Sequence, residues 1–555
     1  MGTKKKAKSN FLVQGTILAA ASIIARIIGM IYRIPLTAIL GDEGNAYYGT
    51  ANEIYSILLM ISTFSLPLAV SKMVSEKMHR GEAKNAHKIF VCAMKFAVIC
   101  GAVMAVLTFL LAGVICRNIM RVDNAVYALR VIAPAIFLFA IAGVFRGFFQ
   151  GQETMIPTAT SQVIEQIVNA VVTVAGAGVM FRYGASIAGE NSSLAPMMAA
   201  AGGTFGTVVS ITVALIFLIV VYLSYSRTFK KQMKMDPSRK LDSDRIIYTT
   251  IILTILPIVF SELIYNISPT LDQAIFNSIL EGQGYTKEQY NTIYGIYLGK
   301  FRVLMNVPLA LASCLAPSVV PALTAAMVDG NFSDARIKVR QTMRYTMILT
   351  IPCAVGMAAL AKPIMYLVFN DNRMLPAGIM QAGSLMIVLF AIATLSTAVL
   401  QGMNRMKEPL VHSAIALAIH VVVLVILLKQ FRLNIYGVVY ANTLFPFILC
   451  ILNFFSIRRH LRYRQELRKT FLLPLISAGV MGLVAMLVYW VFNRLFIIIF
   501  VDRAANAIAT ILAVLAGVVS YLFVLIKLKG LKEHEIANMP KGEMIVNLLH
   551  RIRFL

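Results

Sequence analysis

The sequence predicts an all-α polytopic membrane protein with 14 transmembrane helices, arranged as two six-helix lobes followed by two additional C-terminal helices. Three observations predict this fold: the apolar composition, the alternation of basic connections between apolar segments, and an internal duplication. Of the 555 residues, 59% are apolar and 14% are charged, and the mean hydropathy is +0.78. Because soluble domains carry about 25% charged residues, the composition excludes an ordinary soluble enzyme, a disordered chain and a disulfide-stapled scaffold.

Fourteen apolar segments are long enough to cross a membrane, since about 20 apolar residues span about 30 Å of hydrocarbon. An even number of crossings places both ends of the chain on the same side. The predicted segments are 11–40, 52–71, 89–115, 128–149, 158–181, 197–223, 246–268, 293–327, 343–369, 377–402, 409–429, 435–457, 471–494 and 504–527.

Basic residues gather on every second connection between these segments. With the N-terminus in the cytoplasm, the positive-inside rule is satisfied and the C-terminus is cytoplasmic as well. The formal net charge of +26 then indicates contact with anionic lipid headgroups, with nucleic-acid binding as the weaker alternative. Arg117, Arg121 and Arg130 on one outer connection are the exception. The inner basic residues include Lys4, Lys5, Lys6, Lys8, Lys72, Lys77, Arg80, Lys84, Lys88, Arg227, Lys230, Lys231, Lys234, Arg239, Lys240, Arg245, Arg336, Lys338, Arg340, Arg344, Arg405, Lys407, Arg458, Arg459, Arg462, Arg464, Arg468 and Lys469.

An internal duplication relates the first six segments to the next six. Met78, Gly81 and Ala86 match Met327, Gly330 and Ala335 at a constant offset, and Tyr48-Gly49 and Gln150-Gly151 match Tyr294-Gly295 and Gln401-Gly402. Two similar lobes related by an axis along the membrane normal create a cleft that can open to either side, so the architecture predicts solute movement. The predicted parts are an N-terminal lobe (1–228), a basic linker (229–245), a C-terminal lobe (246–457), two further helices (458–528) and a basic tail (529–555).

Four cations lie in segments that are expected to be membrane-embedded. Arg26 and Arg33 are seven residues apart in the first segment and therefore share a helix face, and Lys300 and Arg302 lie in the eighth. Ionisable groups at bilayer depth usually mark a substrate path, and arginine binds phosphate groups bidentately. The four side chains therefore predict an electropositive cavity for a phosphate or pyrophosphate. The alternatives are snorkelling, or pairing with Glu53, Glu165, Glu262 or Asp272.

Two polar stripes interrupt the fifth and seventh segments. The fifth carries Gln162, Glu165, Gln166 and Asn169 at helical spacing, and the seventh carries Glu262 and Asn266, followed by Asp272. Carboxylate and amide oxygens suit a hard cation, so Glu165, Asn169, Glu262, Asn266 and Asp272 are candidates for coupling to Na⁺ or H⁺ or for gating. Hydrogen bonding between helices explains the same pattern equally well.

The chain lacks the sequence motifs of ATP hydrolysis, metalloprotease, hydrolase and dinucleotide chemistry. We therefore expect no catalytic residues, no bound metal and no cofactor. Transport would be secondary, driven by an ion gradient or the membrane potential.

One stretch resembles a known family. The run from Phe145 to Gln152, then Met155 to Ala159, and the pairs Ser161-Gln162 and Glu165-Gln166 are similar to the polysaccharide-transporter branch of the multidrug/oligosaccharidyl-lipid/polysaccharide (MOP) exporter superfamily, and within it to the stage V sporulation protein B and MurJ-type lipid II flippases. The Ala25 to Gly29 run with Arg33 resembles the arginine-bearing first helix of that family. The resemblance covers essentially the whole chain, including the two extra C-terminal helices.

This resemblance implies a flippase of the bacterial cytoplasmic membrane that carries an undecaprenyl-pyrophosphate-linked peptidoglycan precursor outward, in cell-wall biogenesis, cell shape or sporulation. It implies that Arg26 and Arg33 contact the pyrophosphate, that Lys300 and Arg302 align loosely with further cavity cations, and that the last two helices form part of a groove for the lipid tail. Anionic lipids and cell-wall synthesis enzymes are the expected partners.

Three alternatives remain open at this stage. The cargo could be another polyprenyl-linked saccharide, such as a teichoic-acid, capsule or spore-cortex precursor. A multidrug exporter of the same superfamily would favour an acidic or aromatic cavity, whereas this chain offers basic groups and a single tryptophan, Trp490. A polyprenyl-dependent glycosyltransferase would use Asp42 or Glu43 on the first outer connection as a base, although those residues also fit a solvated turn.

Overall fold

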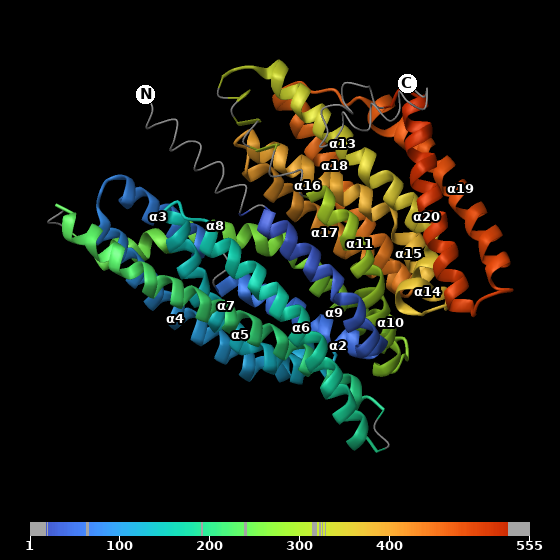
Figure 1. Cartoon of the computed structure of the whole chain (residues 1–555), viewed down its shortest axis with the longest axis horizontal. Helices are drawn as coiled ribbons and strands as arrows, with labels where there is room; N and C mark the ends of the chain where they lie inside the picture. The colour runs from blue at the N-terminus through green and yellow to red at the C-terminus, as the bar shows by residue number, and fades with distance from the viewer. Residues whose placement is uncertain are drawn as a thin grey trace. The chain divides into compact units, whose positions relative to one another are not determined.

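The computed structural model describes residues 18, 20–62, 66–189, 192–237, 241–313, 319–320, 323–324, 326–327 and 329–530, and within these ranges the chain is helical and contains no strand (Figure 1). Lys4 to Lys8, most of the basic tail and part of the basic linker lie outside the described residues. The chain divides into two compact units. Unit 1 comprises Met1–Val303 with Leu424–Ile435, and unit 2 comprises Leu304–Val423 with Tyr436–Leu555. The predicted six-helix lobes stay a prediction.

Unit 1 begins with a short apolar helix, Ala20–Ile31. In Figure 1 the long helices α4 to α7 run side by side. The elements that follow the first helix are α2 (Arg33–Ser62), α3 (Leu66–His79), α4 (Ala83–Val114), the π-helical turn η1 (Ile115–Ile119), α5 (Ala125–Gly151), α6 (Ile156–Ile187), α7 (Leu194–Met235), α8 (Asp244–Asn266), α9 (Ser268–Gly282), α10 (Lys287–Ile296) and the π-helical turn η2 (Tyr297–Phe301).

Helix α2 is broken at Gly41, whose backbone φ of 65° and ψ of −175° are not helical. Glycine tolerates such a conformation because it lacks a Cβ atom. The break frees backbone carbonyls, and the Asn45 side-chain amide donates hydrogen bonds to the carbonyl oxygens of Thr37, at 3.1 Å, and Gly41, at 2.5 Å. The first predicted membrane segment therefore ends at a sharp bend that side-chain hydrogen bonds stabilise.

Helices α6 and α7 pack through glycines. A Cβ atom on Gly176 would lie 2.6 Å from the carbonyl oxygen of Gly202, and one on Gly206 would overlap the backbone of Thr173. Small residues let membrane helices approach closely, and dispersion contacts then hold them together. This contact fixes the helix that carries the predicted polar stripe.

Unit 2 is also built of helices. Its α13 and α14 bend by 84° at Leu360, between the two. In Figure 1 the last two helices, α19 and α20, lie side by side. The elements are α11 (Arg302–Ser313, which begins at the end of unit 1), α13 (Phe332–Ala359), α14 (Ala361–Phe369), α15 (Met374–Gly383), α16 (Leu385–Gly402), α17 (Lys407–Lys429), α18 (Ile435–Leu461), the π-helical turn η3 (Arg468–Leu472), α19 (Leu473–Phe496) and α20 (Asp502–Lys527).

Each of the fourteen predicted segments overlaps a helix, but several helices are broken. Within the described residues, ten helices are long and apolar enough to cross a membrane, or eleven spans if the bent pair of α13 and α14 counts as one. The protein is therefore an all-helical, multi-pass membrane protein, while the count of fourteen crossings stays a prediction. The first and eighth segments depart most, because the helix Ala20–Ile31 ends before Tyr32 inside one and the π-helical turn η2 interrupts the other.

Connections that are expected on one side of the membrane meet within unit 1. Between two connections predicted to be cytoplasmic, the Lys77 ammonium lies 2.7 Å from Asp242 and 3.0 Å from Glu82, and the backbone N–H of Lys84 donates to the Asp236 carboxylate at 2.7 Å. Asn85 and then Lys77 hold the pKa of Glu82 below its usual value. Between two connections predicted to lie outside, Lys287 lies 2.7 Å from Asp123. The orientation of these connections in the membrane stays a prediction.

Candidate functional site

The break in α2 and the turn η2 bring Lys300 and Asp42 together. A Cβ atom on Gly295 would overlap the carbonyl oxygen of Asp42, so only a glycine permits this approach. The Thr37 hydroxyl donates to the carbonyl oxygen of Gly299 at 3.0 Å, which fixes the register. The Lys300 ammonium then lies 2.5 Å from the Asp42 carboxylate, and the two side chains are only 9% and 14% exposed. Lys300 is therefore a buried, neutralised cation.

A second ion pair joins Arg302, at the start of α11, to Glu53 in α2. Their side chains are 27% and 15% exposed. Asp272 of α9 and Arg33 lie within electrostatic range of the same Glu53 carboxylate. Arg302 offsets the charge of Glu53 directly and Arg33 does so at longer range, without an ion pair, which lowers the cost of holding ionised groups away from water. Arg302 thus belongs to a charge-balanced cluster.

Arg26 and Arg33 differ from these paired cations. Among the described residues, neither forms an ion pair with a carboxylate. Arg26 is exposed on the helix Ala20–Ile31, whereas Arg33 is half-buried. The Arg33 guanidinium carbon lies 5.9 Å from the ring centroid of Tyr48, a cation–π arrangement. Both guanidinium groups therefore keep donors for an anionic ligand.

The polar stripe of α6 serves two neighbours. Ser22 donates a hydrogen bond to Gln162 at 3.3 Å, and Asn169 donates to the hydroxyl of Tyr32 at 3.1 Å. Both contacts join α6 to the first helix and the residue that follows it, and the two helices run in the same direction. Glu165 instead faces Arg146 of α5. The stripe therefore supplies hydrogen bonds between helices, while ion coupling by Glu165 and Asn169 stays a prediction.

The two acidic candidates after the sixth segment lie in different surroundings. Asn266 donates to the Glu262 carboxylate at 3.1 Å within α8. Asp272 is buried in α9 and has Glu53 and Tyr297 within electrostatic range. The structure thus brings Asp272 together with Arg302 and Arg33 around Glu53, and gives Glu262 a local partner on its own helix.

Sequence reasoning missed two partners. Asp42 was expected as a solvated or catalytic residue of an outer turn, yet it binds Lys300. Glu43, its neighbour, accepts a hydrogen bond from Ser193 at 2.7 Å. The buried Arg146 lies 2.7 Å from Glu165 and 3.1 Å from the Ser161 hydroxyl. The sequence offered one clue to the Arg146–Glu165 pair: an arginine in an apolar segment requires a partner when it is buried.

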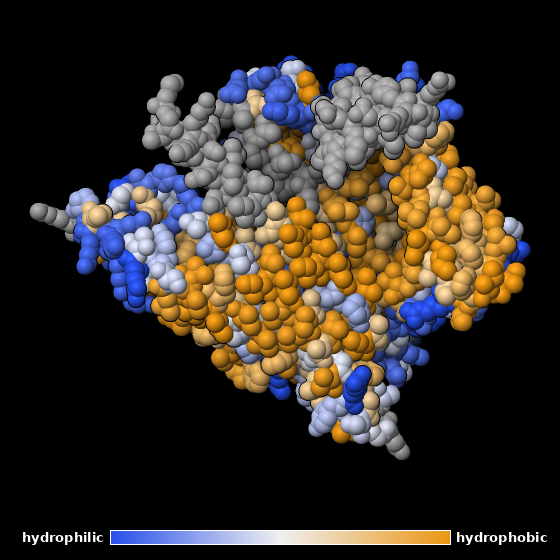
Figure 2. All heavy atoms as spheres, viewed as in Figure 1, coloured by the Kyte–Doolittle hydropathy of each residue, from blue (hydrophilic) through white to orange (hydrophobic). Residues whose placement is uncertain are grey.

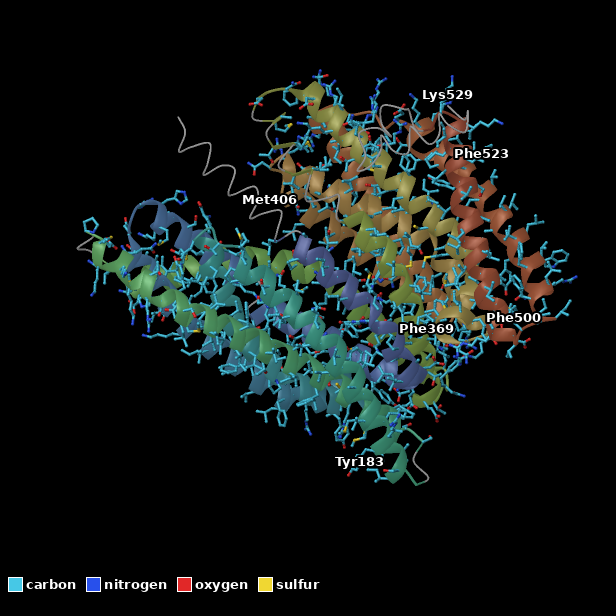
Figure 3. The ribbon with its side chains drawn as sticks, in the orientation of Figure 1. Tyr183, Phe369, Met406, Phe500, Phe523 and Lys529 are labelled. Carbon is cyan, nitrogen blue, oxygen red and sulfur yellow. The ribbon has the colours of Figure 1, made fainter. Side chains whose placement is uncertain are left out.

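An apolar groove of about 590 Å³ lies between α19 and α20, lined by Phe492, Leu515, Val519 and Phe523 among others. Figure 2 shows apolar side chains over the visible surface of these two helices and over α6 and α7. In Figure 3, Phe523 and Lys529 lie toward one end of this helix pair and Phe500 lies at the other. The groove therefore offers an acyl-like chain an apolar wall that runs between the polar ends of the pair.

The fold is that of MOP-superfamily transporters. A structure titled as the inward-facing conformation of a multidrug resistance MATE family transporter of the MOP superfamily matches with a TM-score of 0.63 at 14% identity, over 80% of this chain and 98% of that one. A structure titled lipid II flippase MurJ, inward closed conformation, matches with a TM-score of 0.61 at 14% identity, over 92% and 98%. At these identities the likeness concerns the fold alone.

Residues 12–327 match the family described as polysaccharide biosynthesis protein, and the chain belongs to that family. Among curated relatives, the lipid II flippase MurJ of Bacillus subtilis (strain 168) is 27% identical over 93% of this chain and 95% of its own length. The stage V sporulation protein B of the same strain is 24% identical over 78% and 80%. The chain is therefore a multi-pass membrane protein of a transporter family rather than an enzyme family, which disfavours the glycosyltransferase alternative.

Proposed function

We propose that this protein is a flippase for a polyprenyl-pyrophosphate-linked saccharide and that lipid II is its cargo. The observation that carries the proposal is the pair of guanidinium groups on the first helix and its continuation, Arg26 and Arg33, which bind no carboxylate among the described residues. Pyrophosphate presents several anionic oxygens, and an arginine fork binds two of them at once. The whole-length similarity to the MurJ flippase of Bacillus subtilis supports lipid II as the cargo.

Each candidate group has a place in this proposal. Arg26 and Arg33 contact the pyrophosphate, while Lys300 and Arg302, neutralised by Asp42 and Glu53, hold the surrounding helices in position. The apolar groove between α19 and α20 takes part of the polyprenyl tail. Alternating access moves the head group outward across the cytoplasmic membrane, driven by an ion gradient or by the membrane potential, with Glu165, Asn169, Glu262, Asn266 and Asp272 as candidate coupling or gating groups.

A second candidate cargo within the same class is a spore-cortex or other polyprenyl-linked saccharide. It is supported by the similarity of this chain to four fifths of the length of the stage V sporulation protein B. A multidrug antiporter has only the fold in its favour. Glu53, a carboxylate that could otherwise attract a cationic drug, is paired with Arg302.

Reconstitution into liposomes tests the proposal. Purified protein is combined with labelled lipid II, and its transfer to the opposite leaflet is followed under imposed Na⁺, H⁺ or potential gradients. We expect transfer that unlabelled lipid II inhibits more strongly than polyprenyl-linked teichoic-acid precursors do. Transfer that competes only with another polyprenyl-linked saccharide would reassign the cargo, and the absence of any lipid transfer alongside export of a cationic drug would overturn the flippase assignment.

A further inference from the structure

The ends of η1, α9 and α17 meet in unit 1 and line a pocket of about 690 Å³. The connections that follow these three elements are predicted to face away from the cytoplasm. Asn277 donates to the carbonyl oxygen of Met120 at 2.7 Å, and Gln283 donates to that of Leu428 at 2.8 Å. Tyr290 donates to the carbonyl oxygen of Arg121 at 2.8 Å. These hydrogen bonds tie the three elements together around the pocket.

The rim of this outer pocket is basic. Arg121, Lys429 and Arg432 line it, and Glu281 pairs with Arg121. Among the described residues, neither Lys429 nor Arg432 forms an ion pair. Outer connections normally carry few basic residues, so a cluster there departs from the pattern of the rest of the chain. Because Lys429 and Arg432 share this rim and have no carboxylate partner among the described residues, they predict an anionic ligand.

The inner wall of the outer pocket is apolar, and apolar side chains flank its rim. Ala274, Ile275 and Ile279 of α9 line it together with Val425. Ile119 at its edge and Phe431, between the two unpaired cations, are 56% and 64% exposed. Exposed apolar and aromatic side chains beside cations are typical of the boundary between water and lipid. A ligand with both an anionic group and an apolar part matches this surface better than a free ion does.

We propose that the outer pocket, defined by Arg121, Ile275, Lys429 and Arg432, binds the phosphate group of an anionic membrane lipid. The phosphate oxygens accept hydrogen bonds from Lys429 and Arg432, and the glycerol and upper acyl chain lie against Ile275. This site is separate from Arg26 and Arg33, so it does not depend on the proposed cargo. The proposed site also gives a role to Arg121, which lies on the outer connection that departs from the positive-inside rule.

The test uses the purified full-length protein and fluorescent short-chain phosphatidylglycerol. In a Lys429→Gln/Arg432→Gln double variant, we expect about tenfold weaker binding, since charge-assisted hydrogen bonds to phosphate are lost. Ile275→Trp keeps both cations but fills the apolar wall, and should weaken binding as well. The matched control, Arg494→Gln/Arg503→Gln, removes two cations that flank the connection between α19 and α20 and should stay within about twofold.

Competition identifies the ligand class. Phosphatidylcholine should not displace the probe. Displacement by a polyprenyl pyrophosphate would support a site for lipid phosphate groups and would show that the site accepts this second lipid as well. Inorganic phosphate that competes as well as the lipid would overturn the proposal, because an adventitious ion would then suffice. Unchanged binding in both the double variant and Ile275→Trp, with unfolding temperatures equal to that of the parent protein, would overturn it too.

Discussion

Two groups of cations in unit 1 look alike in sequence but differ in structure. Lys300 and Arg302, around the turn η2, are paired with Asp42 and Glu53. Arg26 and Arg33, on the first helix and its continuation, have no carboxylate partner among the described residues. A paired cation contributes to the fold, whereas an unpaired one retains its hydrogen-bond donors for a ligand. We therefore assign cargo contact to the first helix and positioning to the turn.

The largest effect is expected at the most buried pair. Lys300→Met leaves Asp42 without its cation in a site where both side chains are under 15% exposed. Breaking such a pair costs about 3–5 kcal/mol, so the unfolding temperature in detergent should fall sharply. The double variant Asp42→Asn/Lys300→Met should recover most of that loss.

The matched control is Lys287→Met, which removes an exposed lysine–aspartate pair with Asp123. Exposed pairs contribute about 0–1 kcal/mol. Equal destabilisation by Lys300→Met and Lys287→Met would remove the distinction between buried and exposed cations.

Arg302→Gln should destabilise the protein less, by about 1–3 kcal/mol, because hydrogen bonds to a charged group are lost at a partly exposed site. If Arg302 acts by positioning, Glu53→Gln/Arg302→Gln recovers both stability and lipid transfer. Transfer that stays lost in a double variant of normal stability would move Arg302 into direct cargo contact.

Arg33→Lys keeps the charge but removes the planar fork and its stacking on Tyr48. We expect a stability change below about 1 kcal/mol, the scale of a cation–π contact, and a loss of lipid transfer of about tenfold, the scale of one charge-assisted hydrogen bond. Full transfer activity in Arg33→Lys, measured in the same liposomes, would show that only the charge is needed.

The smallest effect is expected in the polar stripe. Gln162→Leu removes the hydrogen bond from Ser22, and interhelical bonds of this kind contribute about 0.6 kcal/mol. Because the bond joins helices, the dependence of lipid transfer on Na⁺ and pH should not change. A shifted ion dependence would restore Gln162 and its neighbours as ion-coupling groups.

The positions of the helices could be predicted from sequence because apolar length and basic connections reflect the membrane directly. Breaks inside a segment were harder to predict, since the π-helical turn η2 (Tyr297–Phe301) contains no proline to mark it, whereas the bend at Gly41 coincides with the polar run from Gly41 to Asn45 that ends the first segment. The sequence also predicted cations within the apolar segments, at Arg26, Arg33, Lys300 and Arg302. Their partners were not, because pairing of Lys300 with Asp42 depends on the close approach that Gly295 permits in three dimensions.

Transfer of labelled lipid II by Arg26→Ala in liposomes tests the central assignment most directly. The side chain is exposed and unpaired among the described residues, so its removal should leave the unfolding temperature unchanged. The assignment predicts at least about tenfold slower transfer than in the parent protein, from the loss of charge-assisted hydrogen bonds to pyrophosphate. Transfer at the parent rate by a stably folded Arg26→Ala protein would contradict it.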